Sequence, residues 1–190
     1  MIIGGQAVLY YGEPRLTKDV DITLGLGVEG LSLMKEAAKA LDLSIAADDA
    51  YIRDTMVLPA EDKKAGIRVD FIFSITPFEK AAIERAREVK FDEVMVRIAS
   101  LEDLVLHKMV AGRPRDIEDV RSVLLKNPGY DKDYIRGWLS DFDRATGGDC
   151  VNNFDQVVKE IAREAGKQLA RLGGTAKDLK PIPRRRSSRA

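Results

Sequence analysis

Two short segments that carry acids among apolar residues constrain the fold more than any other feature of the sequence. Residues 17–22 are TKDVDI, and from Asp19 onward the stretch DVDITL, residues 19–24, alternates acidic and apolar residues with the period of two that is typical of a β-strand. Side chains two positions apart on a strand point to the same face, so Asp19 and Asp21 project together. The intervening Val20 and Ile22 then face the core. We therefore expect a sheet with one apolar face and one face that carries two adjacent carboxylates.

A third acid lies on a second predicted strand, residues 67–73, with the sequence IRVDFIF. A carboxylate inside so apolar a run is costly unless it is paired or bound to a metal, and a divalent cation is a usual counter-charge for clustered acids. If this strand lies beside residues 19–22, Asp70 joins Asp19 and Asp21 in a site suited to two metal ions. The alternative is a solvated strand face on which Asp70 pairs with Arg68.

Upstream of the first strand, Gly4-Gly5 precedes an apolar segment, residues 6–12, that we interpret as a short helix. Glycine lets the backbone approach a ligand closely, and the N-terminus of a helix favours phosphate. Arg15 and Thr17 lead into the acids, and either can reach a phosphate oxygen. Each of these features is also explained by an ordinary turn or an exposed surface position.

The remaining patterns predict a mixed first half and a helical second half. In the first half we expect a helix, a strand that Pro59 cuts short, a helix capped by Thr76, and a strand, at residues 30–43, 55–60, 76–89 and 92–99. In the second half we expect four helices, at residues 101–112, 113–126, 134–144 and 153–172. We interpret Trp138, with Tyr134 and Phe142, as core.

Together these elements predict an α+β fold, with a small mixed β-sheet and helices followed by a C-terminal helical bundle. The expected boundaries are a core domain over residues 1–99, a helical region over residues 100–175, and a basic, disordered tail over residues 176–190.

Residues 4–22, GGQAVLYYGEPRLTKDVDI, resemble the nucleotidyltransferases of the DNA polymerase β superfamily. Those proteins share a Gly-Gly or Gly-Ser turn, a short helix, a D-x-D strand and a third acid on a later strand. The first motif looks most like that of the bacterial AbiEii-type toxins. Residues 101–120, LEDLVLHKMVAGRPRDIEDV, are similar to the second motif of that group, with Lys108 and Asp116 at its lysine and aspartate positions.

The resemblance implies transfer of a nucleoside monophosphate from an NTP to a hydroxyl of tRNA, a protein or a small molecule, as in the toxin of a toxin–antitoxin pair. It implies that Asp19, Asp21 and Asp70 are the catalytic carboxylates and bind Mg²⁺ or Mn²⁺. The implied nucleotide-binding residues are Gly4, Gly5, Arg15, Thr17, Lys108 and Asp116. For the last two an alternative stays open, in which Lys108 extends to water and Asp116 belongs to a salt-bridged helix start.

Composition limits the other function classes. The 31 basic and 31 acidic residues balance, which excludes a uniformly basic nucleic-acid-binding domain. A single cysteine, Cys150, excludes an intrachain disulfide. We find neither a signal peptide nor a membrane-spanning run, so we expect a cytoplasmic protein without a membrane partner. Two alternatives to the transferase are a non-catalytic module of the same fold that binds a nucleotide or a partner, and another metal-carboxylate enzyme such as a phosphohydrolase.

Overall fold

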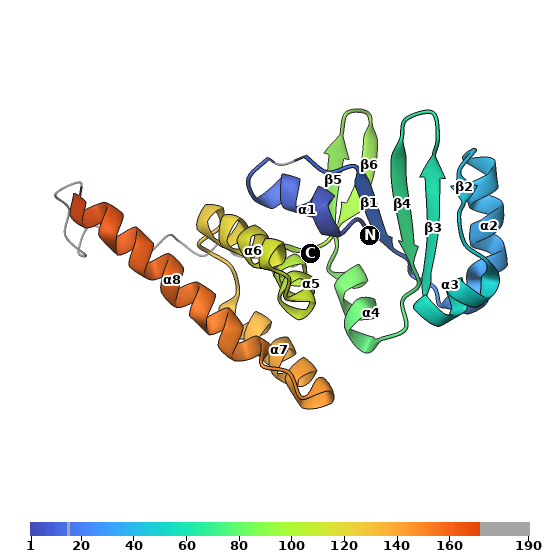
Figure 1. Cartoon of the computed structure of the whole chain (residues 1–190). Coiled ribbons are helices and arrows are strands. Elements are labelled where there is room, and N and C mark those ends of the chain that lie inside the picture. Colours follow the sequence, from blue (N-terminus) through green and yellow to red (C-terminus); the bar gives the residue numbers. More distant parts are fainter. Residues whose placement is uncertain (15, 172–190) are drawn as a thin grey trace, which may run out of the picture. The chain divides into compact units, whose positions relative to one another are not determined.

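The computed structural model describes residues 1–14 and 16–171, which form two compact units (Figure 1). The first unit comprises Met1–Tyr10 and Pro14–Leu104, and the second comprises Tyr11–Glu13 and the chain from Val105 onward. The strands and helices confirm the predicted α+β class. The predicted tail, residues 176–190, lies outside the described residues. No helix among the described residues has the length and apolar character needed to cross a membrane.

A four-stranded mixed sheet is the framework of the first unit. Its strands, in spatial order, are β1 (Asp19–Thr23), β4 (Ile67–Ile72), β3 (Val57–Asp62) and β2 (Ser44–Ile45). Strand β1 runs parallel to β4, and the other neighbouring pairs are antiparallel. The two acid-bearing segments of the sequence are therefore adjacent strands.

One face of this sheet packs against helices α2 (Leu31–Ala40) and α3 (Asp49–Thr55). Leu31 and Ile52 from these helices join Phe71 in the core, and Ile22 packs against the same cluster. Each large apolar side chain buried there contributes roughly 1.5–3 kcal/mol to the free energy of unfolding. Because Ile22 and Phe71 take the inward positions of their strands, the acids that alternate with them take the outward positions.

Strand β3 continues through Pro59, so the prediction that proline would end it was wrong. The Pro59 carbonyl accepts a hydrogen bond from the Ala46 N–H at 3.2 Å, which shows that this residue directs its peptide groups toward β2. Strand β2 ends at Ile45, before the position opposite Pro59. The missing N–H of the proline therefore removes no hydrogen bond from the ladder with β4.

Helix α4 (Pro77–Glu84) begins with the predicted cap Thr76, which forms a capping box with Glu79 in which each side chain bonds the other residue's backbone. It ends earlier than predicted, because Arg87–Phe91 forms strand β5 instead of a last helical turn. Strand β5 pairs in a hairpin with the predicted strand β6 (Val94–Ile98). The cross-strand contacts of the hairpin override the helical pattern of this segment. Isolated bridges join Ile2 to both β1 and β6.

The second unit is helical. Helix α5 (Leu101–Ala111) begins in the first unit and continues into the second, where α6 (Pro114–Lys126), α7 (Lys132–Thr146) and α8 (Cys150–Arg171) follow. The segment Tyr11–Glu13, which connects α1 (Gly4–Tyr11) to β1, belongs to this unit. The side chain of Asn127 donates to the Tyr11 carbonyl at 2.8 Å, and Lys126 forms an ion pair with Glu13 at 2.9 Å.

Candidate functional site

The register between β1 and β4 brings the three predicted acids onto one face of the sheet. Asp21 lies directly opposite Asp70, and Asp19 lies opposite Arg68. Residues that face each other across a ladder present their side chains on the same side. The three acids and Arg68 therefore share the face turned away from the apolar core.

Arg68 is the counter-charge of this face. Its Nε donates to Oδ1 of Asp19 at 2.9 Å. The arginine therefore pairs with Asp19, and not with Asp70 as the alternative to the metal site had proposed. This hydrogen bond is the main cause of the lowered pKa of Asp19. The positive charge of Arg68 also acts on Asp21 and Asp70. Arg68 thus balances part of the charge of these three carboxylates.

Asp70 lies in an environment that disfavours its negative charge. Burial raises the pKa of its carboxyl group, the negative charge of Asp19 raises it further, and Arg68 opposes both effects. A carboxylate with incomplete charge compensation attracts protons and cations. This carboxylate is accordingly a candidate both for accepting a proton and for binding a metal.

Gly4, the first residue of α1, lies against the carboxylate of Asp21. A Cβ atom on Gly4 would lie 1.8 Å from Oδ2 of Asp21, and the backbone of Gly4 has a φ of +60°. Both the close approach and the left-handed conformation require glycine at this position. The sequence analysis predicted such an approach to a ligand, and the structure shows an approach to an acid of the site.

The other residues predicted in this part of the site have simpler surroundings. Gly5 is buried within α1, and the hydroxyl of Thr17 donates to the backbone carbonyl of Asp19 at 3.3 Å. This bond fixes the approach of the chain to β1. Arg15 lies outside the described residues.

The chemistry of the donors fits a hard divalent cation, because carboxylate oxygens are the ligands that Mg²⁺ and Mn²⁺ prefer. Among the described residues, however, no group of three or more His, Cys, Asp or Glu side chains is arranged to hold a metal ion. One carboxylate oxygen of Asp19, Oδ1, is bonded to Arg68. The strand positions of the three acids support the predicted metal site, which stays a prediction.

A second charged cluster, in the helical unit, contains Lys108 and Asp116. The Nζ atom of Lys108 lies 2.7 Å from Oδ1 of Asp116 and 2.9 Å from Oδ2 of Asp119. The side chains of all three are nearly buried, so the alternative in which Lys108 extends to water is wrong. The second oxygen of Asp116 accepts a hydrogen bond from Nε of Arg113 at 2.7 Å. The cluster joins α5 to the start of α6.

This cluster places two cations, Lys108 and Arg113, beside two carboxylates, Asp116 and Asp119. Burial raises the pKa of Asp116, but hydrogen bonds from Lys108 and Arg113 outweigh it, and the net pKa is lowered. Our predicted site omitted Asp119, although its spacing of three from Asp116 places both acids on one face of a helix. The roles of Lys108 and Asp116 in nucleotide binding stay predictions.

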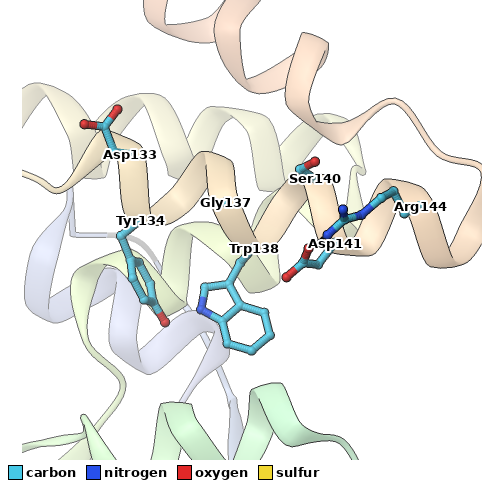
Figure 2. Close-up of a pocket in the computed structure, with 7 residues that line it drawn as sticks. All are labelled: Asp133, Tyr134, Gly137, Trp138, Ser140, Asp141 and Arg144. Carbon is cyan, nitrogen blue, oxygen red and sulfur yellow. Dashed lines mark hydrogen bonds and ion pairs between the residues drawn. The ribbon is translucent and has the colours of Figure 1, made fainter.

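An open groove of about 480 Å³ runs along α7 (Figure 2). The rings of Tyr134 and Trp138 project from the same side of the helix (Figure 2). Both rings and that of Phe142 are only partly buried, so the interpretation of these three as core was wrong. The core positions of α7 are Ile135 and Leu139. The groove is lined by Asp133, Tyr134, Gly137, Trp138, Ser140, Asp141 and Arg144.

Comparison with known proteins found a family model and solved structures that match most of the chain. A family model described as "Nucleotidyl transferase of unknown function (DUF2204)" matches residues 1–160. Six chains of solved structures also match, and one is an antigenic nucleotidyltransferase-like protein from Paracoccidioides brasiliensis. That chain is 14% identical, the match covers 83% of each chain, and the TM-score is 0.49. No curated protein matches. The family model includes both the acid-bearing strands and the Lys108 cluster.

Proposed function

Because the chain belongs to the DUF2204 family, described as nucleotidyl transferases of unknown function, we propose that it transfers a nucleoside monophosphate from an NTP to an acceptor hydroxyl in a metal-dependent reaction. The observation that carries this proposal is the register of β1 and β4. It sets Asp21 opposite Asp70 and keeps Asp19 on the same face.

Asp19, Asp21 and Asp70 are the residues that would hold Mg²⁺ or Mn²⁺. When bound, such an ion neutralises phosphate charge and lowers the pKa of an attacking hydroxyl. Asp70, whose pKa is raised, accepts the proton of the acceptor hydroxyl. The hydroxyl oxygen forms a bond to the α-phosphorus, the bond from that phosphorus to the pyrophosphate oxygen breaks, and pyrophosphate leaves.

The residues before β1 bind the triphosphate in this proposal. The backbone N–H groups of Gly4 and Gly5 lie at the N-terminus of α1, where the helix dipole favours anions. Arg15 and Thr17 add further contacts to phosphate oxygens.

The resemblance of both motifs to AbiEii-type toxins suggests the finer part of the proposal. Lys108, held by Asp116 and Asp119, retains an ammonium proton beyond the two ion pairs and binds the incoming nucleotide with Asp116. The acceptor is tRNA or a protein, and a cognate antitoxin protein restrains the enzyme.

The test incubates the purified chain with each α-labelled NTP, Mg²⁺ or Mn²⁺, total tRNA and cell protein. We expect label on one macromolecule with the wild type, and none with Asp21→Asn or Asp70→Asn. Glu36→Gln is the matched control, because it removes one exposed acid from α2, away from the acid-bearing face. If the two acid variants keep their fold by circular dichroism and still transfer label like the control, the proposal is wrong.

A second candidate is a non-catalytic module that binds a nucleotide or a partner. It is favoured by the ion pair between Arg68 and Asp19, in which an arginine already holds one of the three acids. For this candidate, an NTP with Mn²⁺ raises the melting temperature of the wild type without any label transfer. Label transfer by the wild type would exclude it.

A further inference from the structure

Strand β5 has one open edge. It pairs with β6 on one side, and within the described part of the chain no strand pairs with its other side. A two-residue loop closes the hairpin between Phe91 and Val94. Because an antiparallel ladder alternates, counting back from this closing pair places the peptide groups of Glu88 and Lys90 on the open edge. An open edge of this kind is a template for another strand.

The charges on this edge complement each other in one arrangement. Charged residues on an edge usually discourage pairing, but Glu88 and Lys90 have opposite signs and lie two positions apart. If two β5 strands pair antiparallel about Val89, Glu88 of each copy lies opposite Lys90 of the other. Both residues are exposed, so their side chains are available for this contact, although Lys90 also lies 3.3 Å from Glu93 of its own hairpin.

The same arrangement has a favourable second face. Val89 lies opposite Val89 of the second copy, and Arg87 lies opposite Phe91. The ring of Phe91 is 48% exposed and lies 6.4 Å from the ring of Tyr10, measured between centroids. A guanidinium group stacks well on such a ring. A shift of the register by two residues would instead place Lys90 against Lys90 or Glu88 against Glu88, so the charges select a single register.

We propose that two copies of this chain associate through their β5 edges, antiparallel about Val89, to form a two-fold symmetric dimer with a continuous sheet. A two-fold axis makes each contact occur twice, which suits a short strand that contributes few contacts by itself. The interface is small, so the dimer is weak and depends on concentration.

The association can be measured by analytical ultracentrifugation of the full-length protein. The concentration should run from about 10 μM to about 1 mM, a range suited to a weak interface. We expect a monomer–dimer equilibrium for the wild type. Glu88→Lys and Lys90→Glu each place like charges opposite each other at both of the symmetric 88–90 contacts. Each should raise the dissociation constant of the dimer roughly tenfold. The double variant Glu88→Lys with Lys90→Glu restores the complementary pattern and the association.

Lys63→Glu is the matched control, since it makes the same charge change as Lys90→Glu at an exposed position in the β3–β4 turn. Hydrogen exchange provides a second measurement, and we expect the amides of Glu88 and Lys90 to gain protection as the concentration rises. A monomer at every concentration, or a dimer that the single and double variants affect equally, would overturn the proposal.

Discussion

The buried cluster around Lys108 leads to a sharp prediction for the variant Lys108→Met. Methionine has a similar length and keeps the apolar contacts of the lysine stem, but it removes the ammonium that lies between Asp116 and Asp119. The change therefore isolates the contribution of the charge. It leaves two nearly buried carboxylates beside each other without their shared cation.

The structure sets the size of the effect. Removing one partner of a buried ion pair costs about 3–5 kcal/mol, because the remaining charge stays in the interior. Arg113 still bonds the second oxygen of Asp116, so we expect a loss near the lower end, about 3 kcal/mol. That is a large part of the roughly 5–15 kcal/mol by which a domain is stable.

The expected loss also depends on pH. The lowered pKa of Asp116 means that the folded wild type gains stability above the ordinary carboxyl pKa of about 4 and loses it as the pH falls through the folded value. In the variant no lysine lowers the pKa of Asp116, so the variant loses less stability than the wild type as the pH falls. The difference in the free energy of unfolding between the wild type and Lys108→Met should therefore become smaller below about pH 4.

Urea denaturation followed by circular dichroism measures these differences, with an unchanged m-value as the check on the comparison. Lys132→Met is the control, because Lys132 is 46% exposed and lies 3.8 Å from its partner Asp155. Such a pair contributes about 0–1 kcal/mol. If Lys108→Met costs no more than Lys132→Met, the ammonium of Lys108 does not lie in a buried cluster and our reasoning fails.

Two further variants test the acid-bearing face. Gly4→Ala should lower the free energy of unfolding by at least about 1 kcal/mol more than Gly66→Ala does. Both glycines have a positive φ, but only a Cβ atom at Gly4 would meet Asp21. Equal losses of stability in urea denaturation would contradict the close approach of Gly4 to Asp21. Asp70→Asn should be more stable than the wild type at pH 7, because a carboxyl group whose pKa is raised in the folded state makes the fold less stable as the pH rises above the ordinary carboxyl pKa. The same urea denaturation should show this advantage vanish near pH 4. A variant less stable than the wild type at pH 7 would show that folding does not raise the pKa of Asp70.

Local patterns were sufficient to find β1 and β4 from the sequence. Alternation places Asp21 and Ile22 on opposite faces whatever the rest of the chain does, and the same holds for Asp70 and Phe71. The register between the strands is not local. For that reason the sequence left open an alternative in which Arg68 pairs with Asp70, two positions away on its own strand, whereas the ladder sets Arg68 opposite Asp19.

The elements that were predicted wrongly depend on partners distant in the sequence. The segment Arg87–Phe91 has a helical composition by itself and becomes a strand because Val89 and Phe91 find partners on β6. Strand β2 consists of two residues, too few for any periodicity. Helix α3 did have a local signal that we missed, since Asp48 caps it by accepting a hydrogen bond from the Tyr51 N–H at 2.8 Å.

The assignment of Tyr11–Glu13 to the helical unit has a consequence for attempts to dissect the protein. The chain passes from one unit to the other after Tyr10, after Glu13 and again after Leu104, so no single cut separates the two. A fragment ending at Leu104 would carry three residues whose bonding partners had been deleted, only a few positions ahead of Asp19. Shorter expression fragments therefore risk disturbing the very strand that they are meant to isolate.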